Sequence, residues 1–300
     1  MNTAAVIADA IAVEPPHKPP GPVRVAIGMW RTRIGLAISA LLVLVAFFGR
    51  TIAPYGEREL IGVAMKPASK LNVDSVFGTG ELGTDIWTRF LYGGRPILIT
   101  AFLATVLALV LGSLIGLIAA YNRGRLDDLL MRFMDIILAF PQIILALLVI
   151  SMFGATNTLI VLTVGLSTVP RIARVVRGSA ISVVERDFVS AAEALGESRP
   201  RILMSELLPN VAAPLLVEAN LRLTFSIGVI SGIAFLGFTA DPAAANWGLM
   251  VQENRAGLQG GQPWGTMLPV IAIALLTIGT GLIGDGLSRA AAGVDRKRAD

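Results

Sequence analysis

The side chains that could carry out covalent or metal chemistry are scarce in this sequence. It contains no cysteine and one histidine, His17, which lies in a proline-rich segment outside any apolar run. Without cysteine the chain can form no disulfide, thiolate zinc site or cysteine nucleophile, and His17 alone cannot build a histidine-based triad or a multi-histidine metal site. We therefore expect no catalytic residue and no metal ligands.

Two further enzyme classes fail on the residues that they would need. A phosphate-binding loop ends in Gly-Lys-Ser or Gly-Lys-Thr, and none of the lysines follows a glycine. An intramembrane aspartyl protease needs two buried aspartates, but Asp135 and Asp285 lie at predicted span ends, and Gly284-Asp285 lacks the Gly-x-Gly-Asp pattern. The sequence predicts a protein that is not an enzyme and binds no cofactor itself.

One pair of opposite charges lies inside an apolar run. Glu218 and Arg222 are four residues apart with the acid first, so on a helix they share a face and can form an ion pair. Pairing makes their burial in a helix bundle tolerable. They could line a path through the bundle or serve the structure alone, and the spacing favours the structural role.

A polar segment over 171–209 has the spacing of a helix, a turn and a second helix. Small residues at 191 and 192 allow close packing, Gly196 can cap the first helix and reverse the chain, and Pro209 can end one element and open the next. Such a helical insertion between two apolar runs predicts a docking element. An ordinary solvated loop is the alternative.

The composition places these residues in a membrane protein. Hydrophobic residues make up 54% of the 300, charged residues only 15%, and the mean hydropathy is +0.72, whereas soluble domains are about 25% charged. The net charge of +4 comes from basic residues beside the apolar runs, so we expect contact with membrane lipid and no nucleic-acid partner. The fold class predicted is an all-α integral membrane protein.

Runs without charge predict about six transmembrane helices. A span needs about 20 apolar residues, and the runs after Arg33, Arg95 and Arg255 hold 16, 27 and 29 uncharged residues. The run from Ile136 to Val169 is too long for one span and must fold back near Gly154. The six predicted spans are 33–52, one within 96–122, 131–152, 157–176, 211–238 and one within 256–284.

The basic residues predict the orientation. We place 17 of the 25 Lys and Arg residues on the side of the termini and 7 on the other side, with Arg222 within a span, so both termini are expected in the cytoplasm. A cleaved signal peptide at span one is the less favoured alternative. The predicted organisation is a cytoplasmic tail (1–32), a first transmembrane helix (33–52), an external loop (53–95), a core of five transmembrane helices (96–288) with a coupling loop (178–209), and a cytoplasmic tail (289–300).

The polar insertion resembles the "EAA" loop of permease subunits of binding-protein-dependent ABC importers. The family pattern is Glu-Ala-Ala, three residues, Gly, nine residues, Ile, one residue, Leu-Pro, and this chain departs from it at Ser190 and Glu206. The resemblance extends to the dipeptide, oligopeptide and nickel family, and to its C-type subunit. It rests on Arg177, Ser179, Val183, Glu185, 187–189, 77–85, Arg89, Tyr92, Gly93, Arg95, Phe140-Pro141, 235–237, Trp247-Gly248 and 284–287. The resemblance predicts an ATPase-coupling loop made of Ser190, Ala191, Ala192, Glu193, Ala194, Leu195, Gly196, Leu208 and Pro209.

The resemblance implies a type I ABC importer permease fold with cytoplasmic coupling helices, in a bacterial or archaeal cytoplasmic (inner) membrane. The implied partners are a second homologous permease, two cytoplasmic ATPase subunits that bind ATP and Mg, and an external substrate-binding protein. Residues 188–209 would carry the motion of the ATPases to the spans. Pro141 itself is a possible hinge in the third span, and a static proline kink that serves packing is the alternative.

Three functional hypotheses follow from these expectations. Peptides are the favoured cargo, and nickel or another small polar solute is the alternative within the same family. A stand-alone secondary carrier is the rival from another class, but such a carrier has no use for the long helical insertion. Trp30, Trp87, Trp247 and Trp264 lie near predicted span ends, which favours an aromatic belt.

Overall fold

Long α-helices dominate the part of the chain that the structure describes, residues 22–70 and 74–293 of a computed structural model, and no strand occurs there. Five helices are long and apolar enough to cross a membrane, or six if a bent pair counts as one span. The long helices are α3 (Trp30–Ile52), α4 (Ile86–Asn122), α7 (Asn157–Val184), α11 (Ala212–Phe235) and α13 (Trp264–Ala291). The shorter ones are α2 (Pro22–Gly28), η1 (Ala68–Lys70), α5 (Arg125–Leu138), α6 (Gln142–Phe153), α8 (Asp187–Ala194), α9 (Arg199–Arg201), η2 (Ile202–Leu207), α10 (Leu208–Asn210), α12 (Trp247–Glu253) and η3 (Asn254–Leu258).

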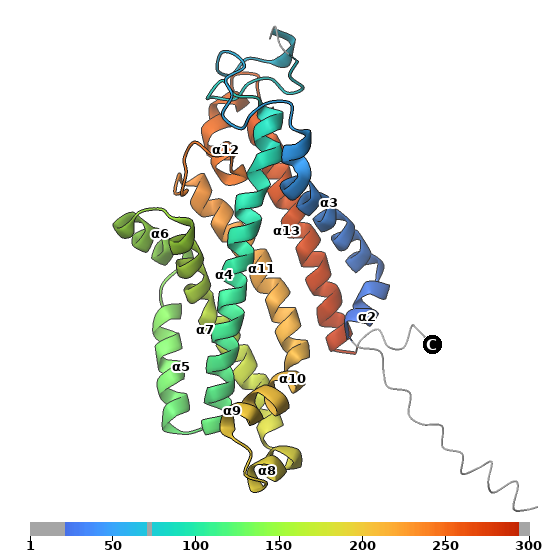
Figure 1. Cartoon of the computed structure of the whole chain (residues 1–300), viewed down its shortest axis with the longest axis vertical. Helices are drawn as coiled ribbons and strands as arrows, with labels where there is room; N and C mark the ends of the chain where they lie inside the picture. Colours follow the sequence, from blue (N-terminus) through green and yellow to red (C-terminus); the bar gives the residue numbers. More distant parts are fainter. Residues whose placement is uncertain (1–21, 71–73, 294–300) are drawn as a thin grey trace, which may run out of the picture.

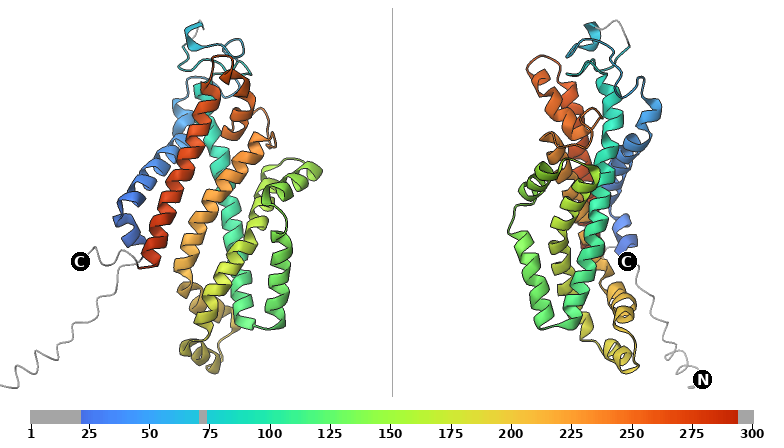
Figure 2. Two further views of the ribbon diagram at one scale, coloured as in Figure 1. Left: turned by 180° about the vertical axis from the view of Figure 1, so that it is seen from behind. Right: turned by 60° about the vertical axis from the view of Figure 1, so that its left-hand side comes forward.

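Helix α4 is the central element of the bundle (Figure 1). It packs along α7 on one side and against α3 and α11 on the other, and α13 lies between α3 and α11. Helices α5 and α6 stand at the far side of α7 from α13 (Figure 2). At a rise of about 1.5 Å per residue, the 37 residues of α4 span about 55 Å, so this helix is longer than a bilayer core of about 30 Å.

The two ends of the bundle differ in structure. Residues 53–70, 74–85 and 236–263 cover one end with turns and short helices, and we call it the cap end. Residues 185–211 form the other, which we call the loop end. Each end has its own apolar cluster, one around Ile97, Ile227 and Trp247 and one around Leu117 and Ile172.

Helices α4 and α7 approach closely because small residues face the contact. A Cβ at Gly112 would lie 2.7 Å from the Ile172 Cβ, and one at Gly116 would lie 2.6 Å from the Ala173 carbonyl oxygen. The helix backbones therefore touch across a seam that only glycine permits. Gly112 and Gly116, four residues apart on α4, thus allow α7 to pack closely against α4.

The segment predicted as one span over 131–152 is instead two helices. Helix α5 ends at Leu138 and α6 begins at Gln142, and the two are bent by 79°. Pro141 lies between them as the N-terminal cap of α6. Proline disfavours the helical conformation of the residue before it and offers no N–H to continue the helix, so the chain breaks here.

Other boundaries also differ from the expected ones. Helix α4 begins at Ile86, so the loop after the first transmembrane helix covers 53–85 rather than 53–95. Helix α7 begins at Asn157 as predicted but continues to Val184, beyond the predicted end at 176, and carries Arg171 at its middle. Of the predicted tails, residues 22–28 form α2, whereas residues 1–21, with His17, and residues 294–300 lie outside the described residues.

Candidate functional site

The polar insertion folds as short helices that extend beyond the ends of the spans at the loop end (Figure 1). Helix α8 contains the resembling residues 190–194, and the chain turns at residues 195–198 into a second helical stretch over 199–210. The two stretches form a hairpin of helices, with Leu208-Pro209 at the end that leads into α11.

Gly196 ends α8 by the mechanism that its position predicts. Its φ of +81° lies in the left-handed region, where a side chain is strained. The Gly196 N–H donates to the Glu193 carbonyl at 3.0 Å and the Glu197 N–H donates to the Ala192 carbonyl at 3.1 Å. These two bonds make a Schellman cap, so the turn after α8 has a defined geometry.

Pro209 does not separate two elements as cleanly as expected. The chain stays helical through α9, a π-helical segment over Ile202–Leu207 and α10. The Leu208 N–H donates to the Leu203 carbonyl, five residues back. A π segment widens the turn before a proline, whose ring would clash with the carbonyl four residues earlier.

One side of the hairpin is built into the bundle. Val189, Ile202 and Leu207 are each 1% exposed or less and belong to the loop-end cluster. The same cluster contains Leu117 of α4 and Ile172 of α7, and Tyr121 of α4 and Ala192 of α8 pack against it. The hairpin is therefore packed against α4 and α7.

The other side of the hairpin faces outward. Leu195 is 84% exposed and Met204 is 54% exposed. No atom lies within 4 Å of the position that a Cβ would take on Gly196. An exposed leucine at the tip of a rigid turn is a protruding apolar contact with no partner in the described part of the chain.

Ion pairs fix the helices that carry the hairpin. The Arg177 guanidinium donates two hydrogen bonds of 2.6 Å to the carboxylate of Asp127, which joins α7 to the start of α5. Arg123, after α4, pairs with Glu185 at 2.8 Å. The sequence indicates Arg177 and Glu185 only through the family resemblance, and the structure shows that their partners are Asp127 and Arg123.

Glu218 and Arg222 form the pair that their spacing predicts. The Arg222 Nε donates to Glu218 Oε1 at 2.6 Å, and both side chains are at least four-fifths buried within α11. Their role in a pathway stays a prediction, as does movement at Pro141.

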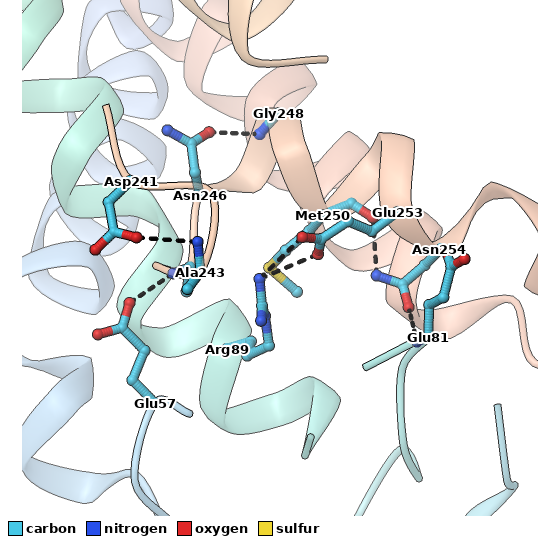
Figure 3. A network of polar contacts seen from close by, with 11 residues as sticks. Glu57, Glu81, Arg89, Asp241, Ala243, Asn246, Gly248, Met250, Glu253 and Asn254 are labelled. Carbon is cyan, nitrogen blue, oxygen red and sulfur yellow. Dashed lines mark hydrogen bonds and ion pairs between the residues drawn. The ribbon is translucent and has the colours of Figure 1, made fainter. Parts of the chain in front are cut away.

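The cap end holds a polar network whose residues lie far apart in the sequence, so it could not be predicted from local spacing (Figure 3). Arg89 of α4 pairs with Glu253 of α12 at 3.0 Å, and the Glu81 N–H donates to Asn254 Oδ1 at 3.0 Å. The pKa of Glu253 is raised mainly because burial disfavours its carboxylate, an effect that the nearby Arg89 charge opposes. Asp85 caps α4 by accepting from the Thr88 N–H at 2.7 Å.

Trp247 lies in the core and not in an aromatic belt. Its exposed fraction is 0%, and its indole N–H donates to the Phe90 carbonyl at 2.8 Å. Its backbone and ring pack against Gly93 and Gly94. Two adjacent glycines in a helix leave room for a large side chain from elsewhere, and this is the signal in the sequence that could have indicated the approach of Trp247.

The sequence of this chain is similar to those of known transport permeases. The sequence model of the family described as "Binding-protein-dependent transport system inner membrane component" matches residues 112–292. The chain is 34% identical over 290 residues to the dipeptide transport system permease protein DppC of Alkalihalophilus pseudofirmus, which covers 91% of this chain and 93% of that one. It is 33% identical over 251 residues to the glutathione transport system permease protein GsiD of Shigella dysenteriae, over 82% of this chain and 81% of the relative.

Among solved structures, the chain is similar to a subunit of the MetNI methionine ABC transporter in an inward-facing conformation. The TM-score is 0.52 at 21% sequence identity, over 66% of this chain and 94% of that one. At this identity the likeness shows the fold alone, which is that of an ABC transporter permease.

Proposed function

Because this chain belongs to the family of binding-protein-dependent transport system inner membrane components, we propose that its helical hairpin over 187–210 is the docking site for an ATPase subunit. The chain itself is a multi-pass permease subunit of an ABC importer in the inner membrane, and its family is not catalytic. ATP and Mg bind to the partner ATPases. ATP hydrolysis reaches the spans as a movement of α8.

The observation that carries this proposal is the two-sided construction of the hairpin. Val189, Ile202 and Leu207 are buried among residues of α4 and α7, whereas Leu195 is 84% exposed at the tip. An element that transmits the movement of an ATPase subunit to the transmembrane helices needs a rigid attachment to those helices and an exposed surface that binds the ATPase. The residues proposed to couple the two are Ser190, Ala191, Ala192, Glu193, Ala194, Leu195, Gly196, Leu208 and Pro209.

The orientation and partners follow from the same proposal. The loop end faces the cytoplasm, where the ATPases are, and both termini are on that side, in agreement with the excess of Lys and Arg there. The cap end faces outward and receives the substrate-binding protein. A second homologous permease completes the pore, and alternating access proceeds by rocking of the two halves.

Peptides are the proposed cargo. Two relatives that match more than four-fifths of the chain are named for transport of dipeptides and of glutathione, which is itself a tripeptide. Nickel or another small polar solute is the alternative within the family.

A substitution at the exposed tip tests the docking site. Leu195→Asp places a charge on the contact surface without touching the buried side, so the variant is expected to reach the membrane and retain the second permease. In a mild-detergent pull-down followed by mass spectrometry, we expect ATPase recovery to fall at least tenfold, a loss of about 1.4 kcal/mol or more in binding.

The matched control lies at the opposite end. Val63→Asp changes a side chain that is 71% exposed in the cap, and it should leave ATPase recovery unchanged. Full ATPase recovery with Leu195→Asp, or equal losses in both variants, would remove the hairpin as the docking site.

A further inference from the structure

Two arginines and one glutamate lie together within the spans, away from the hairpin. Arg171 occupies the middle of α7, and Glu218 and Arg222 lie roughly 9 and 15 Å along α11 from its first residue at the loop end, at about 1.5 Å per residue. Helices α7 and α11 pack against each other, and the charges of Arg222 and Glu218 act on the Arg171 guanidinium. The cluster therefore carries two positive charges and one negative charge.

Glu218 is already used by Arg222, so Arg171 has no acid of its own in the described residues. The Arg222 Nε donates to Glu218 Oε1 at 2.6 Å. Arg171 Nη1 donates to the neutral amide oxygen of Gln142 at 2.9 Å, and the Gln142 amide nitrogen donates to Thr168 Oγ1 at 3.1 Å. A cation at membrane depth with only a neutral partner is costly to hold, which is a mark of a functional position.

Several guanidinium donors of this cluster remain available. Nε and Nη2 of Arg171 and both Nη atoms of Arg222 make no hydrogen bond within the described residues. None of these atoms is among the buried polar atoms without a partner, so each is open to the space beside the helices. Arg222 lies 5.5 Å from the ring centroid of Phe225, which is 60% exposed.

The break between α5 and α6 adds to the positive potential. It brings Gln142, the first residue of α6, to the Arg171 side chain. The N-terminus of α6 has no side-chain cap, and a helix N-terminus favours negative charge. Half-helix ends of this kind face anionic substrate groups in transporters.

We propose that Arg171, Arg222 and Gln142 form a transit site for the carboxylate of a cargo that passes through the loop-end half of the permease. The free guanidinium donors match the two oxygens of a carboxylate. Glu218 holds Arg222 in place and leaves the cluster with a single net positive charge, so an anion is attracted but can leave. The inference rests on the proposed function, since the C-terminal carboxylate of a peptide is the group that the site would meet.

A thiol probe tests the charge of the site without knowledge of the cargo. The chain contains no cysteine, so Phe225→Cys introduces a single thiol beside Arg222. In the purified complex, we compare the modification rates by a sulfonate-bearing and by a trimethylammonium-bearing methanethiosulfonate. Arg171→Gln should lower the ratio of the sulfonate rate to the trimethylammonium rate by about five- to tenfold, because one unit charge nearby is removed.

Arg174→Gln is the matched control, because Arg174 lies three residues further along α7, is exposed and pairs with Asp135. It should leave the ratio unchanged. If Phe225→Cys does not assemble, Gly228→Cys, whose Cβ meets no atom within 4 Å, carries the thiol instead. A ratio that Arg171→Gln leaves within twofold overturns the proposal.

Transport in proteoliposomes containing the full complex tests the cargo group. With the tripeptide Ala-Ala-Ala as probe, Arg171→Gln should lower uptake per ATP hydrolysed at least tenfold, and Arg171→Lys should stay within about threefold of the wild type. Equal effects of the two variants, or failure of Arg171→Gln alone to assemble, overturn the transit site. If the wild type takes up no tripeptide while the thiol ratio still responds to Arg171, the anion site stands and peptide cargo is wrong.

Discussion

At the scale of single residues, one buried ion pair joins the cap to the spans. Arg89 and Glu253 are 164 residues apart in sequence and 3.0 Å apart in space, with exposed side-chain fractions of 5% and 14%. The Arg89 Nε atom is buried without a partner. The contact between the two charges is therefore made by the Nη2 atom of Arg89, which donates to both carboxylate oxygens of Glu253 at 3.4 and 3.0 Å.

Removal of one partner should be far more harmful than removal of both. Arg89→Met leaves the Glu253 carboxylate buried and unpaired, and we expect it to cost about 3 to 5 kcal/mol. The double variant Arg89→Met with Glu253→Met should regain most of that loss. Thermal unfolding in detergent measures both, and a double variant no more stable than Arg89→Met would show that the pair does not couple the cap to α4.

At the scale of elements, the contact between α4 and α7 carries the bundle. A Cβ at Gly116 would meet the Ala173 carbonyl oxygen at 2.6 Å and the Val176 Cβ at 2.9 Å. Backbone atoms cannot move aside as a flexible side chain can, so the two helices would have to separate. The hairpin, which packs on both helices, would move with them.

Gly116→Val should therefore destabilise the bundle by about 1 to 3 kcal/mol through overpacking. Gly178→Ala on α7 is the matched control, because a Cβ there meets no atom within 4 Å, and it should be neutral or stabilising by up to about 1 kcal/mol. The midpoints of thermal unfolding in detergent distinguish them. Equal midpoints would mean that α4 and α7 can part at no cost.

The long apolar helices could be predicted from the sequence, but their breaks and exact ends could not. Charge-free runs located the long apolar helices because an unpaired charge is costly in lipid. They did not reveal the 79° break at Pro141, since residues on both sides are apolar whether the helix is straight or bent. They also mark only the part of α4 after Arg95, because a charge-free run stops at a charge, whereas the helix begins at Ile86 and includes Arg89 and Arg95.

For the candidate site, the sequence predicted the local conformation around Gly196, but it did not predict how the hairpin packs on the spans. Gly196 and the small residues before it indicate a capped helix, since a left-handed turn favours glycine. The exposure of Leu195 and the burial of Val189 depend on how the hairpin packs on α4 and α7. The partnership of Arg171 with Gln142 depends on the 79° break between α5 and α6, whereas the sequence indicated Pro141 only as a possible hinge.

At the scale of the whole molecule, the chain is one subunit of an ABC importer. Helices α5 and α6 stand at one side of the bundle (Figure 2) with exposed large apolar side chains, for example Phe133, Ile136, Ile144 and Met152. Such a surface needs lipid or another membrane subunit to cover it. The hairpin at the loop end and the cap end are two further faces, which we propose bind an ATPase subunit and the substrate-binding protein.

The most direct test of this account is to purify the tagged chain in mild detergent, identify what accompanies it, and reconstitute the result in liposomes. The account predicts co-purification of a second permease and of ATPase subunits, with tripeptide uptake that requires ATP and the substrate-binding protein. Purification of the chain alone, with uptake in liposomes that lack ATP, would contradict it and would establish a stand-alone carrier instead.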